Sequence, residues 1–293
     1  MQEWYGSMVW TLGQQLWNGA VSGIVYSVFA MGLTVLFGMM GVINMAHGEF
    51  FMLGALLLFT FVVTLKVPFL LSLVLVPLIV AALGVVFNQV AIRPLLRQQP
   101  LSVMMSSMAV SIMLVNIAIV VWNTDTRVVP TPFDGSLRLG GIILPQSALV
   151  LSIIGIVALL ALNTLITKTP IGQIMRATAQ DRTGAMLIGI DVRMVYAATV
   201  ALSALLAAVA GEIVAPILSA FPTMGADILL KGFAVIIVGG MGSIRGCVIV
   251  GLVLGITEAL FAQYISTAYV DAYAFTLLII MCLVRPQGVF ANA

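Results

Sequence analysis

Long apolar stretches dominate the chain. A helix needs about 20 apolar residues to cross a bilayer. Stretches of about that length lie at 16–38, 49–65, 69–92, 102–122, 146–167 and 195–220, and the more broken C-terminal third has runs at 228–238, 246–262 and 268–284. The pattern predicts an all-α integral membrane protein, a polytopic helical bundle of about eight or nine spans in one domain over residues 1–293. A re-entrant hairpin at 228–246 would change the count by one.

Composition supports a membrane protein and argues against several other classes. Hydrophobic residues make up 62% of the chain and charged residues 8%, against about 25% charged residues in soluble domains. A net charge of +2 argues against nucleic acid as a partner. The chain has one histidine and two cysteines, so we expect membrane lipid as the surroundings, no metal site and no catalytic residues.

The positive charges predict an orientation, because cytoplasmic loops of membrane proteins carry an excess of Lys and Arg. Arg93 follows one span, four basic residues crowd the segment 168–194, and Arg285 follows the last apolar run. Alternation of spans puts these three places on one side, which we assign to the cytoplasm. The loop 123–145 then lies on the opposite, periplasmic side, with the N-terminus outside and the C-terminus inside.

The segment 168–194 is the more informative of the two long polar segments. Thr169 can cap a helix whose first residue is Pro170, where the missing N–H costs nothing. Gly184 loosens the following turn, and Gly189 marks the end of the helical pattern. Two interpretations stay open: an amphipathic helix at the lipid headgroups, or a helix that docks into a groove of a cytoplasmic partner.

Two glycine-rich segments interrupt the apolar sequence, one at 38–49 and the other at 239–246. Unwound backbone at membrane depth is tolerated only where it is buried in protein or lines an aqueous cavity. Paired interruptions in the two halves of a transporter are typical of inverted repeats around a central pathway. We therefore predict broken or re-entrant helices, an inverted repeat, and a substrate pathway formed by Asn44, His47, Glu49, Gly239, Gly240, Gly242 and Ser243.

Ionisable residues within the apolar stretches are candidates for function by default. For His47 and Glu49 the alternative is a structural role, in which hydrogen bonds hold the broken helix in place. Glu212, Lys231 and Glu258 carry the same ambiguity, and Lys231 has the charge to pair with either carboxylate.

Three motifs resemble those of the permease subunits of ATP-binding cassette (ABC) importers for branched-chain amino acids, of the LivH type. The first is Gly-x-Ile-Asn-x-Ala-His-Gly-Glu, at 41–49, and the second is Gly-Gly-x-Gly-Ser-x-x-Gly, at 239–246. The third is the Arg-Ala-x-Ala-Glu-Asp stretch of the cytoplasmic coupling loop, which stands at 176–181 with Gln180 in place of Glu. The resemblance covers nearly the whole chain.

This resemblance implies a function and a set of partners. The chain would be the permease subunit of an importer in the bacterial inner membrane, carrying branched-chain or other small hydrophobic amino acids into the cytoplasm. Its partners would be a paralogous permease in a heterodimer, two ATP-binding cassette ATPase subunits and an external solute-binding protein. The segment 168–194 would then couple to the ATPases through Arg176, Ala179, Gln180, Asp181, Gly184 and Gly189.

The chain itself lacks the phosphate-binding loop Gly-x-x-x-x-Gly-Lys-Ser/Thr, since none of its three lysines stands in that pattern. We therefore expect no cofactor on this chain, no enzymatic activity, and ATP and Mg²⁺ on the partner subunits.

Two alternatives remain. Related urea permeases share the first motif, so urea, short amides or small carboxylates are possible solutes, although Gly242-Ser243 favours the amino-acid branch. The second alternative is a proton-coupled secondary transporter that uses His47, Glu49, Glu212 or Glu258.

Overall fold

A computed structural model describes residues 2–96, 98–285 and 288–290, and for residues 2–8 and 282 it describes the backbone alone. The remaining positions of the predicted domain, 1, 97, 286–287 and 291–293, lie outside the described residues. The elements in chain order are α1 (Gln2–Met40), α2 (His47–Phe59), η1 (Thr60–Thr64), α3 (Phe69–Phe87), η2 (Asn88–Ile92), η3 (Arg93–Leu95), α4 (Pro100–Trp122), β1 (Ser136–Leu139), β2 (Ile142–Pro145), α5 (Gln146–Lys168), α6 (Pro170–Gln180), α7 (Arg182–Leu187), α8 (Val192–Leu218), α9 (Met224–Gly239), α10 (Ile244–Tyr264) and α11 (Val270–Val284).

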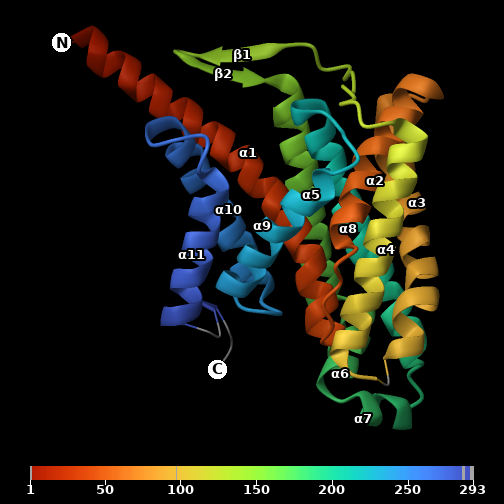
Figure 1. Ribbon diagram of the computed structural model, residues 1–293. Coiled ribbons are helices and arrows are strands. Elements are labelled where there is room, and N and C mark those ends of the chain that lie inside the picture. The colour runs from red at the N-terminus through yellow and green to blue at the C-terminus, as the bar shows by residue number, and fades with distance from the viewer. Residues whose placement is uncertain (1, 97, 286–287, 291–293) are drawn as a thin grey trace.

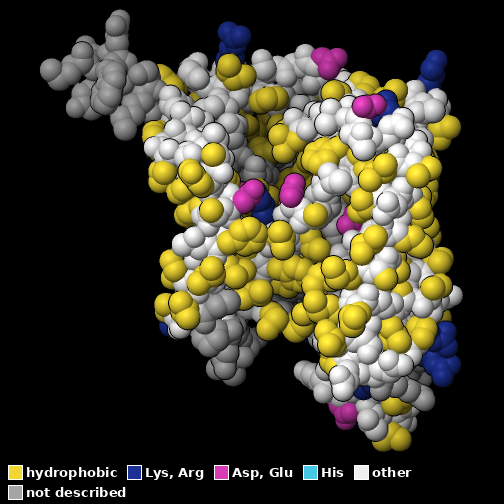
Figure 2. All heavy atoms as spheres, viewed as in Figure 1, with side chains coloured by type: hydrophobic (Ala, Val, Ile, Leu, Met, Phe, Trp, Pro, Cys, Tyr) yellow, Lys and Arg dark blue, Asp and Glu magenta, His cyan; other side chains and the backbone are white. Residues whose placement is uncertain are grey.

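The long helices run between two ends of an elongated bundle (Figure 1). One end carries the N-terminus and the β1–β2 hairpin, and the other carries α6 and α7. We call these the hairpin end and the α6–α7 end. Apolar side chains cover much of the middle of the face in Figure 2, and Lys and Arg side chains lie mainly toward the two ends. This distribution suits a bundle whose middle is surrounded by lipid.

The all-α membrane fold is confirmed, with a lower count of long spans than predicted. Among the described residues, seven helices are long and apolar enough to cross a bilayer. The difference arises in the C-terminal third, because α9 has 16 residues and α11 has 15, short of the roughly 20 that a full crossing needs. The stretch 228–238 is thus part of a short helix that begins at Met224. The inverted repeat stays a prediction.

Helix α1 lies at the centre of the packing. Small residues let it approach α10 closely: a Cβ atom on Gly255 would lie 2.6 Å from the Gly19 carbonyl oxygen, and one on Gly251 would lie 2.9 Å from the Ser27 nitrogen. Small residues at such crossings are the usual device for helix association in lipid, where apolar burial alone gives little driving force.

The loop 123–145 folds onto the hairpin end as an ordered structure. Its strands β1 and β2 pair antiparallel, with Ser136 opposite Pro145. The hairpin is tied to α1 by the Gln14 side chain, which donates to the Ile143 carbonyl at 3.0 Å and accepts from the Ile143 N–H at 2.8 Å. A backbone bridge joins Arg127 to Ala220, just after α8. Loop 123–145 and the end of α8 are therefore held together.

The segment 168–194 begins as predicted but contains a break. Thr169 caps α6, its Oγ1 accepting from the Gly172 N–H at 3.1 Å, and Pro170 is the first helical residue. The single helical pattern is interrupted at Asp181, whose backbone is extended and whose Oδ1 accepts from the N–H groups of Thr183 and Gly184. The expectation of one helix was wrong here because an aspartate is a strong N-cap and starts the new helix α7.

Candidate functional site

The first interrupted segment turns back into the bundle. α1 ends at Met40, and α2 begins at His47. The His47 ring is fully buried, and its Nε2 lies 3.1 Å from the carbonyl oxygen of Phe29. Phe29 lies about three helical turns before the end of α1. The chain therefore runs back along α1, so that α2 starts deep in the protein, as a broken helix would.

Hydrogen bonds hold this segment from several sides. The Asn44 Oδ1 accepts from the Ala46 N–H at 3.0 Å, and the His47 Nδ1 lies 3.2 Å from the Ser203 hydroxyl on α8. The Glu49 Oε1 accepts from the Ser111 hydroxyl on α4 at 2.9 Å. Asn44, His47 and Glu49 are all buried, and these contacts correspond to the structural role considered for His47 and Glu49.

Helices α2 and α9 start at the same point inside the bundle. Gly48, at the start of α2, is in backbone contact with Gly225, at the start of α9, and a Cβ atom on Gly225 would lie 2.6 Å from the Gly48 carbonyl oxygen. Glycine at both positions permits this crossing.

The second interrupted segment is the turn between α9 and α10. Gly240 and Gly242 have φ values of +95° and +91°, a region that glycine enters without steric cost. The Ser243 hydroxyl accepts from the Gly246 N–H at 3.1 Å and caps α10. Gly239 packs against Gly246. The turn thus has a fixed shape and faces α1, where a Cβ atom on Gly38 would lie 3.4 Å from the Gly242 Cα.

A cavity of about 570 Å³ opens beside this turn at the α6–α7 end. We call it the α6 cavity. Its lining comes from α1, α5, α6, the α9–α10 turn and the start of α10: Thr34, Val35, Gly38, Met39, Asn163, Ile166, Thr167, Arg176, Ala179, Gln180, Met241, Gly242, Ser243, Ile244 and Arg245. It brings Gly242 and Ser243, predicted for the pathway, together with Arg176, Ala179 and Gln180, predicted for ATPase coupling.

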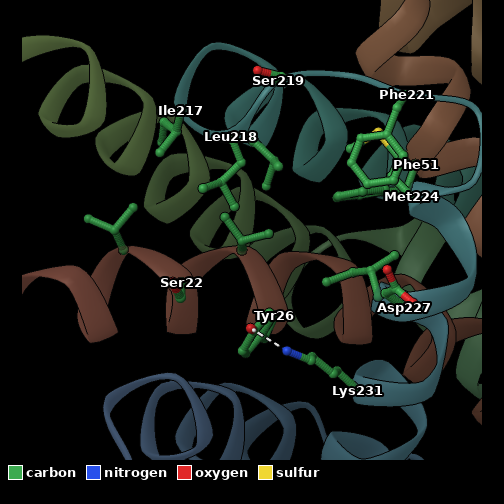
Figure 3. Close-up of a pocket in the computed structure, with 14 residues that line it drawn as sticks. Ser22, Tyr26, Phe51, Ile217, Leu218, Ser219, Phe221, Met224, Asp227 and Lys231 are labelled. Carbon is green, nitrogen blue, oxygen red and sulfur yellow. Dashed lines mark hydrogen bonds between the residues drawn. The ribbon is translucent and has the colours of Figure 1, made fainter. Parts of the chain in front are cut away.

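A second hollow of about 190 Å³ lies nearer the hairpin end, between α1, α8 and α9 (Figure 3). We call it the Tyr26 pocket. Its lining is Val21, Ser22, Val25, Tyr26, Phe51, Val214, Ile217, Leu218, Ser219, Phe221, Met224, Asp227, Ile228 and Lys231. Figure 3 shows the charged groups of Asp227 and Lys231 on one side, away from Ile217 and Leu218 on the other.

Both hollows lie along α1 and are separated by packed side chains. Val21 to Tyr26 line the Tyr26 pocket, and Thr34 to Met39 line the α6 cavity. All α1 residues from 27 to 33 are buried. Gly232 of α9 faces the Phe29 ring, since a Cβ atom on Gly232 would lie 2.5 Å from the ring and 3.0 Å from a methyl group of Leu33. We call residues 27–33 with Gly232 the seal.

Sequence reasoning left open the partner of Lys231, and the structure identifies it. Lys231 Nζ lies 3.4 Å from Glu258, 3.2 Å from Asp271 and 3.3 Å from the Tyr26 hydroxyl. Tyr26 in turn donates to Glu258 at 2.7 Å. The cluster joins α1, α9, α10 and α11. Glu212 lies elsewhere, buried on α8.

Tyr26, Asp227 and Asp271 were missed as site residues. Asp271 carried a usable signal, because it is the only charged residue in the apolar run 268–284. Tyr26 carried none, since tyrosine is common in membrane helices. Across the described part of the chain, no group of three or more His, Cys, Asp or Glu side chains is placed to hold a metal ion.

The segment 168–194 presents an apolar surface at the end of α7. Asp181 caps α7, Gly184 lies within α7, and Gly189 follows it with a φ of +87°. Leu187 and Ile188 are 84% and 76% exposed, and Met186 is 50% exposed. We call these three residues the α7 tip. Arg176 instead points toward the α6 cavity and is half-buried.

The sequence of the chain is similar to those of known transport proteins. Residues 15–284 match the family described as branched-chain amino acid transport system / permease component. The chain is 33% identical to the high-affinity branched-chain amino acid transport system permease protein LivH of Salmonella typhimurium and 34% identical to LivH of Escherichia coli, each over 95% of both chains. It is 31% identical to the corresponding permease protein BraD of Pseudomonas aeruginosa, also over 95% of both chains.

A solved structure, PsaBC from Streptococcus pneumoniae in complex with Fab, is similar in fold. The TM-score is 0.50 at 14% sequence identity, with 92% of this chain and 91% of that chain covered.

Proposed function

The chain belongs to the family of branched-chain amino acid transport permease components, and from this premise we propose how it works. It is a membrane-spanning subunit of an ABC importer that moves branched-chain or other small hydrophobic amino acids into the cytoplasm. It is a multi-pass protein of the bacterial inner membrane, and its function is transport without chemical change of the solute.

The observation that carries this proposal is the pair of hollows on α1. The Tyr26 pocket lies toward the hairpin end, the α6 cavity lies toward the α6–α7 end, and the seal separates them. A transporter needs access from one side at a time. Movement of α1 against α9 would open the seal where Phe29 faces Gly232. The opened seal would connect the Tyr26 pocket to the α6 cavity.

The chemistry of the Tyr26 pocket suits a small amphipathic solute. Its volume of about 190 Å³ is below the roughly 300–1,000 Å³ of pockets for drug-sized ligands. The apolar wall around Ile217 and Leu218 suits an aliphatic side chain, and the exposed Asp227 carboxylate suits an ammonium group. Urea is polar on all sides and would lose hydrogen bonds against that wall.

The α7 tip is the proposed contact with an ATPase subunit. Exposed apolar patches rimmed by polar residues mark interaction sites, and a short helix can fill a groove of a partner. ATP and Mg²⁺ are held by the two ATPase subunits, since this chain lacks the phosphate-binding loop. Binding at the tip would move α6, which forms a wall of the α6 cavity.

The remaining partners and the orientation follow from the same scheme. The α6–α7 end faces the cytoplasm, with the N-terminus outside and the C-terminus inside. The hairpin end receives the solute-binding protein, and a paralogous permease completes a heterodimer.

Orientation is testable with a membrane-impermeant thiol reagent, in a background with both native cysteines replaced by alanine. Ser219→Cys in the Tyr26 pocket should react from outside, and Ser243→Cys in the α6 cavity only from inside.

A proton-coupled secondary transporter receives less support. All four candidate proton carriers are buried, and none of them lines the Tyr26 pocket or the α6 cavity: His47, Glu49, Glu212 and Glu258. A proton carrier needs access to both sides in turn.

Purification of the tagged chain in a gentle detergent tests the assembly. Mass spectrometry of the proteins that co-purify should identify ATPase subunits and a second permease sequence. Recovery of the chain alone, with transport driven by an ion gradient in proteoliposomes, would overturn the proposal in favour of a secondary transporter.

A further inference from the structure

A polar pocket of about 320 Å³ at the α6–α7 end has no role in the transport scheme above. It lies where η2 and η3 meet the starts of α7 and α8. Its lining is Asn88, Arg93, Pro94, Leu96, Arg182, Val192, Arg193 and Tyr196. Three of these eight residues are arginines and none is acidic, so the pocket concentrates positive charge.

The three arginines lack acidic partners. Within the described part of the chain, the ion pairs involve Arg127 and Lys231 and none of these arginines. The nearest acidic residues in the sequence cap helices and form no ion pair with these arginines: Asp181 accepts from the backbone of α7, and Asp191 accepts from the Arg193 N–H at 3.0 Å. Among the described residues, no carboxylate is therefore paired with these guanidinium groups, and their charge is available to an anion.

Two further groups shape the pocket for a ligand. The Asn88 side chain is 2% exposed, and its Oδ1 has no hydrogen-bond partner among the described residues. A buried amide oxygen without a donor normally signals a missing water or ligand. Toward an anion, Asn88 would present its NH₂ group instead, because a half-turn of the amide exchanges the oxygen and the nitrogen. The Arg182 guanidinium lies 5.5 Å from the centre of the Tyr196 ring, a cation–π contact that holds it at the pocket wall.

Exposed apolar side chains lie on the helical segment that leads to Arg93. Val86 on α3 and Val90 on η2 precede Arg93 and are 56% and 72% exposed. An amphiphile with an anionic head and apolar tails matches this arrangement. Basic pockets at the cytoplasmic ends of spans bind anionic lipid headgroups in this way.

We propose that this pocket, formed by Asn88, Arg93, Arg182 and Arg193, binds the phosphate of an anionic phospholipid whose acyl chains lie along Val86 and Val90. Arginine is suited to the task because its planar fork of donors matches phosphate oxygens. The lipid would join η2–η3 to the starts of α7 and α8, and so would brace the α7 tip against the bundle. This site does not depend on which solute is carried.

The experiment measures lipid retention by the purified intact assembly, using native mass spectrometry with phosphatidylglycerol, phosphatidylcholine or inorganic phosphate as probes. Phosphatidylglycerol should bind at least about tenfold more tightly than phosphatidylcholine. The double variant Arg93→Gln with Arg193→Gln should weaken phosphatidylglycerol binding by about tenfold or more. The matched control is Arg138→Gln, which removes an exposed arginine from β1 at the hairpin end and should change nothing.

Each other outcome has a definite meaning. Equal binding of the two lipids, or an unchanged double variant, would overturn the site. Binding of inorganic phosphate as tight as that of phosphatidylglycerol would overturn the lipid and leave a simple phosphate site. Loss of the ATPase subunits from the double variant with lipid binding intact would identify the pocket as a protein interface instead. If the double variant does not fold, the single variants Arg93→Gln and Arg193→Gln, each at an exposed side chain, replace it, and each should also weaken phosphatidylglycerol binding.

Discussion

Gly48 and Gly225 are in backbone contact at the point where α2 and α9 begin: a Cβ atom on Gly225 would lie 2.6 Å from the Gly48 carbonyl oxygen. These residues come from the two halves of the chain, and each lies in the first turn of a helix inside the bundle. The contact holds α2 beside α9, which carries Asp227 and Lys231 of the Tyr26 pocket.

Gly225→Ala should destabilise the protein by about 1–3 kcal/mol, because the added methyl group overpacks a contact between two backbones. Gly38→Ala is the matched control, since its Cβ would lie at an ordinary 3.4 Å from its nearest neighbour. Thermal unfolding in detergent compares the two. Equal midpoints of thermal unfolding for the two variants would show that the α2–α9 contact is not tight.

Lys231→Met should destabilise the protein strongly, by about 3–5 kcal/mol, because it leaves the buried Glu258 carboxylate without its cation. Asp271→Asn should cost at most about 1 kcal/mol, since the Asp271 side chain is 74% exposed. Adding Glu258→Gln to Lys231→Met should recover part of the loss. A double variant no more stable than Lys231→Met would argue against the pairing.

Leu187→Glu in the α7 tip should abolish co-purification of the ATPase subunits while leaving the permease folded. The leucine is exposed, so the charge is tolerated in the isolated chain but not in an apolar groove of a partner. Leu139→Glu, also at an exposed leucine but on the hairpin, should keep the ATPase bound. Normal recovery of the ATPase with Leu187→Glu would remove the docking assignment.

Ser22→Leu should block uptake by filling the Tyr26 pocket, and Asp227→Asn should reduce uptake about tenfold by removing the carboxylate offered to the ammonium group. Asp134→Asn, at an exposed carboxylate in the loop 123–145, is the control. Rates are measured with the complete assembly in vesicles, and basal ATP hydrolysis checks its integrity. Unchanged uptake by both pocket variants would place the solute elsewhere.

The sequence allowed good prediction of the spans, because long apolar runs are decided locally. The runs at 102–122 and 146–167 correspond to α4 (Pro100–Trp122) and α5 (Gln146–Lys168). The start of α1 was less predictable. The helix extends back to Gln2, through polar residues such as Gln14 and Gln15 that the apolar pattern leaves out.

The geometry around the glycine interruptions was predictable in part, and the role of these residues in a solute pathway stays a prediction. Glycine interruptions indicated unwound backbone, and Gly242 and Ser243 do line a cavity. The Tyr26 pocket could not be predicted, because Tyr26, Phe51 and Lys231 come from three helices and meet only after folding. The break at Asp181 was missed because an aspartate within a helical pattern serves equally well as a surface residue or as a cap.

Uptake of labelled leucine by proteoliposomes that contain the complete assembly and its solute-binding protein tests the central claim most directly. The account predicts uptake that requires ATP on the α7 side, persists when ion gradients are collapsed, and is lost with Leu187→Glu. Uptake by this chain alone, driven by a proton gradient and indifferent to ATP, would contradict it.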